Sequence, residues 1–447
     1  MTDELLAILE PFITKAQKLG ADEVEFFAQR QSIKNVNFES NNLKTATASE
    51  VEGVGIRVLI NHALGFTSVN SLQKEKIAEG LKEAIAIARV TPPEDYYYLP
   101  TPHKFPSVID LYDPSIESLT MDEAINYSKT LLQNSIEYDK RISIDSGIFD
   151  ATSGIRALVN SNGISIAERK STFTYGIIGM AIDGEDVGSF DAEFDSVIKV
   201  KEINVDKVAE EFSKKALQML GAKKTESFEG SMILTPEVAA DLFNLLIYSA
   251  TATNIQSGSS YLQDKVGDKI AVDNLTIYDD GTVKNNTGSS SFDREGVPRK
   301  KLSIIDKGTF TGVLYDTFTA NKEKLSSSGH ASGSFRNVPN ISPTNLFISP
   351  GKEPIDDIIN QLDNGILVQR ISASPDPISG DFSGVVKGGK LIKNGQKTDT
   401  LKEVTAVGNI FQSLKNITHI SKEVKPLRGN QNWYVPYVVI DGIKFIS

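Results

Sequence analysis

The proline-rich segment from Thr91 to Pro106 limits the fold more than any other feature of this sequence, because it separates two regions of regular pattern. It reads TPPEDYYYLPTPHKFP, holds five prolines and shows neither helical nor strand periodicity. Proline lacks a backbone N–H and has a fixed φ, so this segment suits an extended connector better than an element interior. We predict a connector over residues 93–112. It divides the 447 residues into a first domain (1–92), a middle region (113–223) and a C-terminal domain (224–447).

The first domain is predicted to be a small α+β unit. Apolar residues at helical spacing over residues 3–19 indicate an amphipathic helix, which Gly20 ends. The pattern that follows predicts a meander of strands and then a helix that can cover one face of it. The predicted strands are Glu23–Arg30, Asn35–Glu39, Gly55–Ile60 and Gly65–Asn70, and the helix is Lys74–Arg89.

The middle region has the same mixture of elements and is compatible with forming one unit with the first domain. We predict strands joined by a tight turn at Asn162-Gly163, because both residues tolerate positive φ. The other predicted elements are helix Met121–Tyr138, strands Thr172–Ala181 and Val187–Val200, and helix Val205–Leu220. The segment Gly55–Asn61 shares five of seven residues with Gly154–Asn160. Internal duplication and chance both account for this similarity.

The C-terminal domain is predicted to be rich in short strands. It begins with strand Gly230–Leu234, followed by Thr235 as a helix cap and Pro236 at the first helical position. The helix is predicted to reach about Ala252, and its nearly all-round apolar surface indicates a buried helix. Shorter helices are expected near Asp356–Gln361 and Asn409–Asn416. The fold class is therefore a multi-domain α+β protein, with antiparallel sheets and covering helices in the N-terminal half and a β-rich C-terminal domain around a buried helix.

Composition excludes several kinds of function. The chain has no cysteine, which excludes disulfides, thiolate nucleophiles and zinc sites that contain cysteine. A formal charge of -11 disfavours direct binding to nucleic acid. The basic run Arg299-Lys300-Lys301 is interpreted as a solvated loop or strand end. The acidic start and the lack of an apolar run of transmembrane length favour the cytoplasm.

No short motif for catalysis stands out. The histidines His62, His103, His330 and His419 are scattered, without the close helical spacing of protease zinc sites. Serines surround His330, but no Gly-x-Ser-x-Gly turn is present. The segment from Gly384 to Leu391 resembles a phosphate-binding loop, yet Leu391 lacks the hydroxyl that binds magnesium, so nucleotide binding is rejected. The acid pairs Asp279-Asp280 and Asp356-Asp357 are interpreted as turn formers.

Several separated segments of the C-terminal third resemble the TldD/PmbA family. They are Asp279-Asp-Gly281, Phe292-Asp-Arg-Glu-Gly-Val297, Thr344-Asn-Leu-Phe-Ile-Ser-Pro-Gly351, Asp381-Phe-Ser383 with Gly395, and Glu403-Val-Thr-Ala-Val-Gly-Asn409. Near the N-terminus, Gly55-Ile-Arg-Val-Leu-Ile60 and Leu64-Gly-Phe-Thr67 are similar to the first domain of the family. The resemblance covers most of the chain and is weakest over residues 115–222, where it rests on the order of helices and strands.

The resemblance implies that this chain lacks the zinc site of the TldD branch. That branch has a His-Glu-x-x-x-His motif on the helix after strand Gly230–Leu234 and a cysteine near the C-terminus. By alignment on Val266-Gly267, the two histidines fall near Phe243 and Tyr248, the glutamate near Asn244, and the cysteine near Arg428 or Gly429. None of these residues replaces a zinc ligand or a carboxylate base. The chain resembles the PmbA/TldE branch in this respect.

The family then implies a metal-free, non-catalytic subunit with no cofactor of its own. Its partner would be a TldD-like metallopeptidase subunit that carries zinc, and the complex would degrade or process unfolded peptides and small proteins. A homodimer in isolation is compatible with this. The family label "modulator of DNA gyrase" is interpreted as an indirect effect, because the chain is acidic.

Two alternatives stay open at this level. One is an independent peptidase or hydrolase that uses His330 with neighbouring serines or acids. The other is a non-enzymatic adaptor that affects turnover of a toxin–antitoxin pair or a gyrase inhibitor. Specific contact residues are not readable from the pattern. Asp293, Glu295, Asn345 and Asn409 are interpreted as turn residues, because Asp and Asn beside Gly bind local backbone groups.

Overall fold

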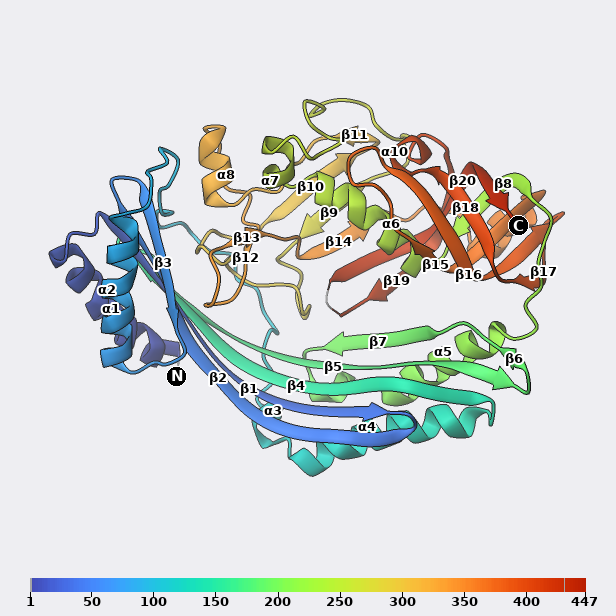
Figure 1. Ribbon diagram of the computed structural model, residues 1–447, viewed down its shortest axis with the longest axis horizontal. Helices are drawn as coiled ribbons and strands as arrows, with labels where there is room; N and C mark the ends of the chain where they lie inside the picture. Colours follow the sequence, from blue (N-terminus) through green and yellow to red (C-terminus); the bar gives the residue numbers. More distant parts are fainter. Residues whose placement is uncertain (1, 430) are drawn as a thin grey trace.

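A long, curved, seven-stranded sheet forms the N-terminal half of the protein (Figure 1). The computed structural model describes residues 2–429 and 431–447. The strand order is β3-β2-β1-β4-β5-β6, and β7 also pairs with β5. The strands are β1 (Glu23–Glu39), β2 (Asn42–Ile60), β3 (Ala63–Val69), β4 (Ile142–Asn160), β5 (Ser165–Asp183), β6 (Asp186–Val187) and β7 (Asp191–Val197).

Strand β1 joins the first and middle regions into one sheet, because it pairs with β2 on one side and β4 on the other. The prediction of two separate strands, Glu23–Arg30 and Asn35–Glu39, is wrong. The intervening residues stay in register with both neighbours, which supply hydrogen-bond partners along the whole strand. The predicted strand Val187–Val200 is also wrong in extent, since it divides at residues 188–190 into β6 and β7.

Helices cover the outer face of this sheet (Figure 1). Side chains of β1 alternate between faces, and Phe26, Val36 and Phe38 point into the helical layer. The helices α1 (Thr2–Lys18) and α2 (Lys74–Ala88) pack near one end, and α4 (Met121–Tyr138) and α5 (Val205–Gln218) pack near the other. Helix α4 begins as predicted, where Thr120 and Glu123 form a reciprocal cap. A short helix, α3 (Ser115–Ser118), and a 3₁₀ turn, η1 (Val200–Glu202), complete this layer.

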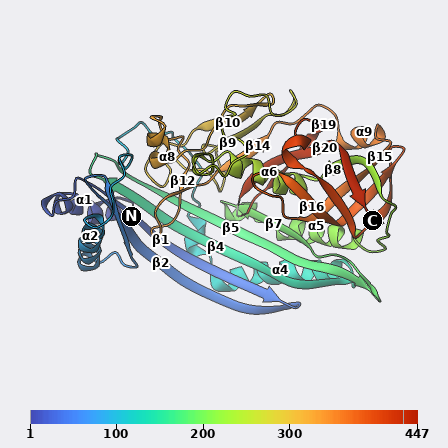
Figure 2. The same ribbon diagram turned by 45° about the horizontal axis from the view of Figure 1, so that its top comes forward.

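The C-terminal domain is built on an eleven-stranded sheet and lies along the inner face of the N-terminal sheet (Figures 1 and 2). Its strands are β8 (Phe228–Leu234), β9 (Ile277–Asp280), β10 (Lys301–Asp306), β11 (Thr309–Phe310), β14 (Asn345–Ile348), β15 (Asn364–Ala373), β16 (Asp381–Lys393), β17 (Gln396–Leu401), β18 (Val404–Asn409), β19 (Ile417–Leu427) and β20 (Asn432–Ile446). A small ladder pairs β12 (Ala331–Ser332) with β13 (Asn340–Ile341). The helices are α6 (Pro236–Ser249), α7 (Ala252–Gln256), α8 (Thr317–Lys322), α9 (Ile355–Asn360) and α10 (Ile410–Ser413). The predicted α+β fold class is confirmed.

Helix α6 differs from its prediction in three ways. It ends at Ser249 and not near Ala252. Thr235 precedes it, but the Thr235 hydroxyl makes no capping hydrogen bond. Its surface is not buried all round, because Asp241 is exposed and Tyr248 is 51% exposed. The predicted helix Asn409–Asn416 is likewise shorter, since α10 covers Ile410–Ser413. Within the described residues, no helix combines the length and apolar character needed to cross a membrane.

A buried ion network fastens the N-terminal sheet to the C-terminal domain. Arg57 Nη1 donates to Glu295 Oε1 at 2.7 Å, and Arg57 Nε donates to Glu25 Oε1 at 3.0 Å. Arg294 Nη1 donates to the same Glu25 oxygen at 2.8 Å, and its guanidinium lies over the ring of Phe27. Burial raises the pKa of Glu25, but Arg57 and Arg294 lower that pKa more, so Glu25 stays ionised. The network therefore joins two layers through fully desolvated charges.

Replacing Arg57 by methionine is expected to destabilise the protein by about 3 kcal/mol, because the substitution leaves Glu295 buried without its arginine. Urea unfolding of Arg57→Met and wild type measures the difference. Arg30→Met is the matched control, since Arg30 lies on the neighbouring strand and pairs with Glu4 and Glu52 at a side-chain exposure of 35%. The control should lose less than about 1 kcal/mol. Equal losses in the two variants would show that the buried network does not hold the layers together.

Candidate functional site

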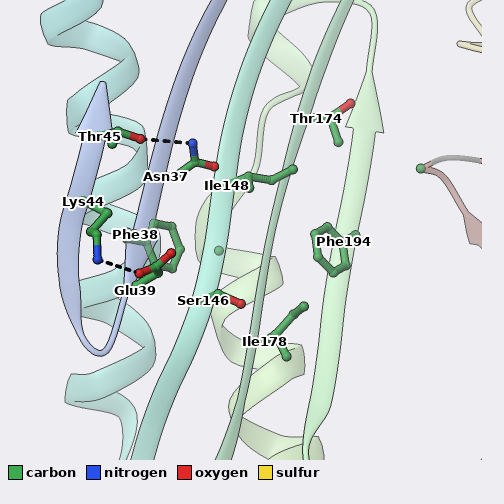
Figure 3. A pocket seen from close by; sticks show the side chains of 12 residues that line it. Asn37, Phe38, Glu39, Lys44, Thr45, Ser146, Ile148, Thr174, Ile178 and Phe194 are labelled. Atoms are coloured by element: carbon green, nitrogen blue, oxygen red, sulfur yellow. Dashed lines mark hydrogen bonds and ion pairs between the residues drawn. The ribbon is translucent and has the colours of Figure 1, made fainter. Parts of the chain in front are cut away.

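A hollow lies between the inner face of the N-terminal sheet and the C-terminal domain, in the cleft that separates these two layers. It has a volume of about 680 Å³, and Gly429, two residues after β19, lines it from the C-terminal domain. Figure 3 shows side chains of several strands around it, with Thr45 bonded to Asn37 and Lys44 paired with Glu39. The floor therefore carries both polar and apolar groups, and it is made by neighbouring strands of one sheet.

Phe194 on β7 forms the side wall of this hollow, and Gly176 on β5 makes its position possible. The two residues are cross-strand partners. A Cβ atom on Gly176 would lie 2.0 Å from the Phe194 ring. Any larger residue at position 176 would therefore displace the ring, and with it the wall between this hollow and the next.

A second hollow of about 300 Å³ adjoins the first, since Phe194 and Gly429 line both. One face of α6 forms its opposite wall. The lining residues of α6 are Glu237, Ala240, Asp241 and Asn244. Their spacing of three and four residues places them on one side of the helix. This hollow lies at the helix on which the sequence resemblance places the lost zinc motif.

An ion quartet of two lysines and two glutamates closes one side of the second hollow. Lys215 Nζ on α5 lies 2.6 Å from Glu193 Oε2 and 2.7 Å from Glu237 Oε1. Lys425 Nζ on β19 lies 3.0 Å from Glu193 Oε1 and 3.0 Å from Glu237 Oε1. Burial raises the pKa of Glu237, but the two lysines outweigh burial and lower that pKa to about 2. The quartet thus joins four elements and keeps Glu237 ionised.

Two further contacts bind Asp195 and Asn244. Arg428 binds Asp195 through two hydrogen bonds, from Nε at 2.8 Å and from Nη2 at 3.0 Å. Trp433 Nε1 donates to Asn244 Oδ1 at 2.9 Å. The Arg428 guanidinium therefore binds Asp195, and the Trp433 indole binds Asn244. Arg428 and Asn244 are positions at which the sequence resemblance places a zinc ligand and the catalytic base of the TldD branch.

The structure separates the three positions assigned to the lost motif. Phe243 is 2% exposed and packs in the core of the C-terminal domain, whereas Tyr248 is 51% exposed. Residues five apart on an α-helix lie about 140° apart around its axis, so Phe243 and Tyr248 do not face one point. Only Asn244 lines the second hollow. Arg428 and Gly429, assigned to the cysteine position, also line it.

The residues of the second hollow do not fit a zinc ion. Zinc prefers imidazole and thiolate ligands, and this hollow contains neither. Glu237 is bound by two ammonium groups, and the Arg428 guanidinium would repel a dication. Over residues 2–429 and 431–447, no group of three or more His, Cys, Asp or Glu side chains could hold a metal ion.

His330 lies between Ser328 and Asp279 in a buried hydrogen-bonded serine–histidine–aspartate row. Ser328 Oγ lies 2.8 Å from His330 Nδ1, and His330 Nε2 lies 3.1 Å from Asp279 Oδ1. All three side chains are buried. Asp279 also accepts the backbone N–H of Thr344 at 2.6 Å, and Ser328 Oγ accepts that of Tyr315 at 2.7 Å. A substrate cannot reach the buried Ser328 hydroxyl. The hydrogen bonds of Ser328, His330 and Asp279 therefore stabilise the loops that carry Tyr315 and Thr344.

The remaining histidines stand apart. His62 Nδ1 contacts the carbonyl of Tyr97, His103 is exposed within the connector, and His419 contacts Thr418 on β19. The segment Gly384–Leu391 lies inside β16, which agrees with the rejection of a phosphate-binding loop.

Several residues interpreted as turn formers have other roles. Asp279 fastens Thr344 and His330, whereas Asp280 does bind its own turn at Thr282. Asp356 and Asp357 form the first turn of α9, where negative charge favours the helix dipole.

Asp293 accepts three backbone N–H groups and is a turn residue, as predicted. Glu295 is not, because it pairs with Arg57 across the two layers. Asn345 binds Ser289 and Asn432, and Asn409 caps α10.

The interpretation of Arg299-Lys300-Lys301 as a solvated run is wrong for its first residue. Arg299 is buried and donates to the carbonyls of Gly329 and Ala331. Lys301 begins β10, and its ammonium group lies over the ring of Tyr278. Only Lys300 is an exposed residue free of such packing.

The ion quartet predicts a specific dependence on acid. The pKa of Glu237 is lower in the folded protein than its ordinary value, so its contribution to stability is present above about pH 4.5 and is lost as pH falls toward 2. Glu237→Gln should therefore reduce the free energy of unfolding by about 2 kcal/mol at neutral pH and flatten its decline below pH 4.5. Urea unfolding at several pH values measures both effects.

Glu210→Gln is the control, because Glu210 forms an exposed pair with Lys214 on the surface of α5. This variant should keep the wild-type decline in acid. If Glu237→Gln keeps it too, the quartet does not stabilise the fold.

Comparison with known proteins agrees with this architecture. The chain matches three domain models of one family: PmbA/TldA metallopeptidase domain 1 (residues 24–88), central domain (114–220) and C-terminal domain (228–447). An uncharacterized protein of Methanocaldococcus jannaschii is 28% identical over 91% of this chain and 93% of its own length. Metalloprotease PmbA of Escherichia coli O157:H7 is 23% identical, over 94% of this chain and 92% of its own length.

A solved structure has the same fold over nearly the whole chain. The crystal structure of TldE from Thermococcus kodakarensis superposes with a TM-score of 0.91 at 23% sequence identity, covering 98% of this chain and all of that one. Since the three domain models match in order and together span most of the sequence, the chain belongs to the PmbA/TldD metallopeptidase family.

Proposed function

We propose that this chain is the metal-free, non-catalytic subunit of a TldD/TldE-type metallopeptidase complex that degrades or processes unfolded peptides and small proteins in the cytoplasm. A TldD-like partner carries the zinc. The observation that carries this proposal is the second hollow, where cations and an indole bind the polar groups of α6 and β7. A catalytic zinc site in proteins is built mainly from imidazole and thiolate ligands, and the described lining residues of this hollow include neither.

The first hollow supports a role in holding extended peptides. Its floor is a sheet, and it carries short polar side chains from neighbouring strands. Strand β2 adds a free edge, because its residues 42–53 pair with β1 alone among the described strands. An unpaired edge offers backbone donors and acceptors to an extended segment. The names of the relatives, metalloproteases PmbA and TldD, support the peptidase assignment.

The isolated chain is expected to purify with substoichiometric zinc and to leave an unfolded fluorogenic peptide intact. Zinc analysis and a cleavage assay test this directly. Cleavage should appear when a TldD-like chain is added, and the two chains should elute together in size-exclusion chromatography. The TldD-like chain alone is the control for activity. A zinc-loaded, active preparation of the isolated chain would refute the proposal.

An independent hydrolase is the second candidate, and the Ser328–His330–Asp279 row is the observation in its favour. We expect His330→Ala to lower stability, because the substitution removes one hydrogen bond from each of two buried groups, Ser328 and Asp279. His419→Ala is the control, because His419 is half-buried on β19 and bonds only to the neighbouring Thr418 among the described residues.

If the purified chain shows peptidase activity, our proposal attributes it to a zinc-bearing partner, so a chelator should abolish it. The activities of His330→Ala and His419→Ala should then be equal, once each is divided by the folded fraction of that variant. Activity that survives chelation and disappears only in folded His330→Ala would establish the hydrolase. If no TldD-like chain co-purifies and no cleavage is found, the non-enzymatic adaptor is the better description.

A further inference from the structure

The polar side chains that line the first hollow are already bonded within the protein. Asn37 Nδ2 donates to Thr45 Oγ1 at 3.2 Å, and Lys44 Nζ donates to Glu39 Oε2 at 2.9 Å (Figure 3). The other two lining hydroxyls also have partners: Ser196 for Thr174, and Asp145 for Ser146. A ligand that takes over one of these hydrogen bonds only exchanges it for another and gains little net free energy. Because Lys44 and Glu39 balance each other, charge does not select the occupant of this hollow either.

The apolar side chains of the same hollow are left partly uncovered. Ile148 on β4, Ile178 on β5 and Phe194 on β7 are each half-buried and line it. Ile148 and Phe194 are the two cross-strand partners of Gly176, one on each side, and Ile178 lies two residues further along β5. Residues two apart on a strand share a face of the sheet, so all three side chains lie on the inner face. We call Ile148, Ile178 and Phe194 the apolar strip.

Gly176 makes the apolar strip continuous. Neighbouring strands lie about 4.8 Å apart, so a side chain at position 176 would stand between Ile148 and Phe194. The Phe194 ring occupies this place instead, since a Cβ atom on Gly176 would lie 2.0 Å from it. The ring therefore covers the glycine and extends the apolar surface from β7 toward β4.

The shape of the cleft favours an elongated occupant. The first hollow leads into the second, because Phe194 and Gly429 line both. An extended peptide can pass from one to the other, and its successive side chains point in opposite directions. One side chain then points down to the apolar strip while its two neighbours point to the C-terminal domain.

We propose that the apolar strip is a subsite for one large apolar side chain, such as leucine or phenylalanine, of an extended peptide bound in the cleft. This inference rests on the proposed function and specifies which peptides the cleft holds. Burial of apolar surface against Ile148, Ile178 and Phe194 supplies the preference. Large apolar side chains are mostly buried in folded proteins and accessible in unfolded ones, so the subsite favours unfolded segments.

Fluorescence anisotropy on the full chain tests this preference without a partner subunit. The probes are short labelled peptides of alternating serine and threonine that differ only at the central position, which is leucine, phenylalanine, serine or glutamate. The leucine and phenylalanine peptides should bind saturably and at least about tenfold more tightly than the other two, because they bury an apolar side chain. N-acetylphenylalanine amide should compete at least about tenfold more weakly than the phenylalanine peptide, since it lacks the chain.

Three results of this titration overturn the proposal. They are equal affinities for all the peptides, no saturable binding of the leucine and phenylalanine peptides, and equal binding of the single amino acid derivative. The last result would show that the hollow binds a small apolar molecule and not a peptide.

Variants locate the preference in the apolar strip. Ile148→Thr and Ile178→Thr should each reduce the preference for phenylalanine over serine by at least about threefold, because each removes apolar contact. Ile87→Thr is the control, since Ile87 is 41% exposed on α2, outside the cleft. Thr45→Val keeps the side-chain shape and removes a polar group, so it should not weaken binding. Melting temperatures confirm that each variant is folded.

A preference that survives both isoleucine variants would place the peptide elsewhere, and one that is lost in Thr45→Val would show that the hollow recognises polar groups. Either result overturns the proposal. The cleavage assay with a TldD-like chain is separate from this test. Selective binding without partner-dependent cleavage would refute the proposed function alone, whereas cleavage without selective binding would refute this inference alone.

Discussion

The buried network of Glu25, Arg57, Arg294 and Glu295 is the interaction on which the arrangement of the two layers depends. Desolvated charges are stable only in their paired geometry, so this contact allows little sliding between the N-terminal sheet and the C-terminal domain. It lies near one end of β1. At the other end the layers meet through the ion quartet and the Arg428–Asp195 pair. The cleft is the space between the two layers that lies between these two sets of ion pairs. Its width is set by the ion pairs at both ends.

The need to pair buried charges also explains why lysines and an arginine lie beside the carboxylates of the second hollow. Helix α6 presents Glu237, Asp241 and Asn244 toward β7, which itself carries Glu193 and Asp195. Such a concentration of carboxylates needs positive charge nearby. Lys215 on α5, Lys425 on β19 and Arg428, which follows β19, supply it here. The helix can then pack its other face, including Phe243, as ordinary apolar core.

Local signals in the sequence predict the helices well and the long-range contacts poorly. Helix α4 was predictable to the residue, because Thr120 and Glu123 act within one turn of its start. The continuity of β1 was not predictable from local signals, because its polar middle is held extended by pairing with β2 and β4. The family resemblance singles out α6, but of its three predicted positions only Asn244 lines the second hollow. The partners of Glu237 lie on α5 and β19, far away in the sequence, and no spacing rule connects them.

The ion quartet also constrains how this site can evolve. A histidine introduced on the inner face of α6 would meet Lys215, Lys425 and Arg428, and these cations oppose an incoming dication. Removing one lysine first would leave a buried carboxylate short of its partner and lower stability. Each single step toward a metal centre therefore passes through a less fit intermediate, and only coordinated changes on three elements avoid it. Such coupling between residues opposes the gain of a metal centre at this site by single substitutions.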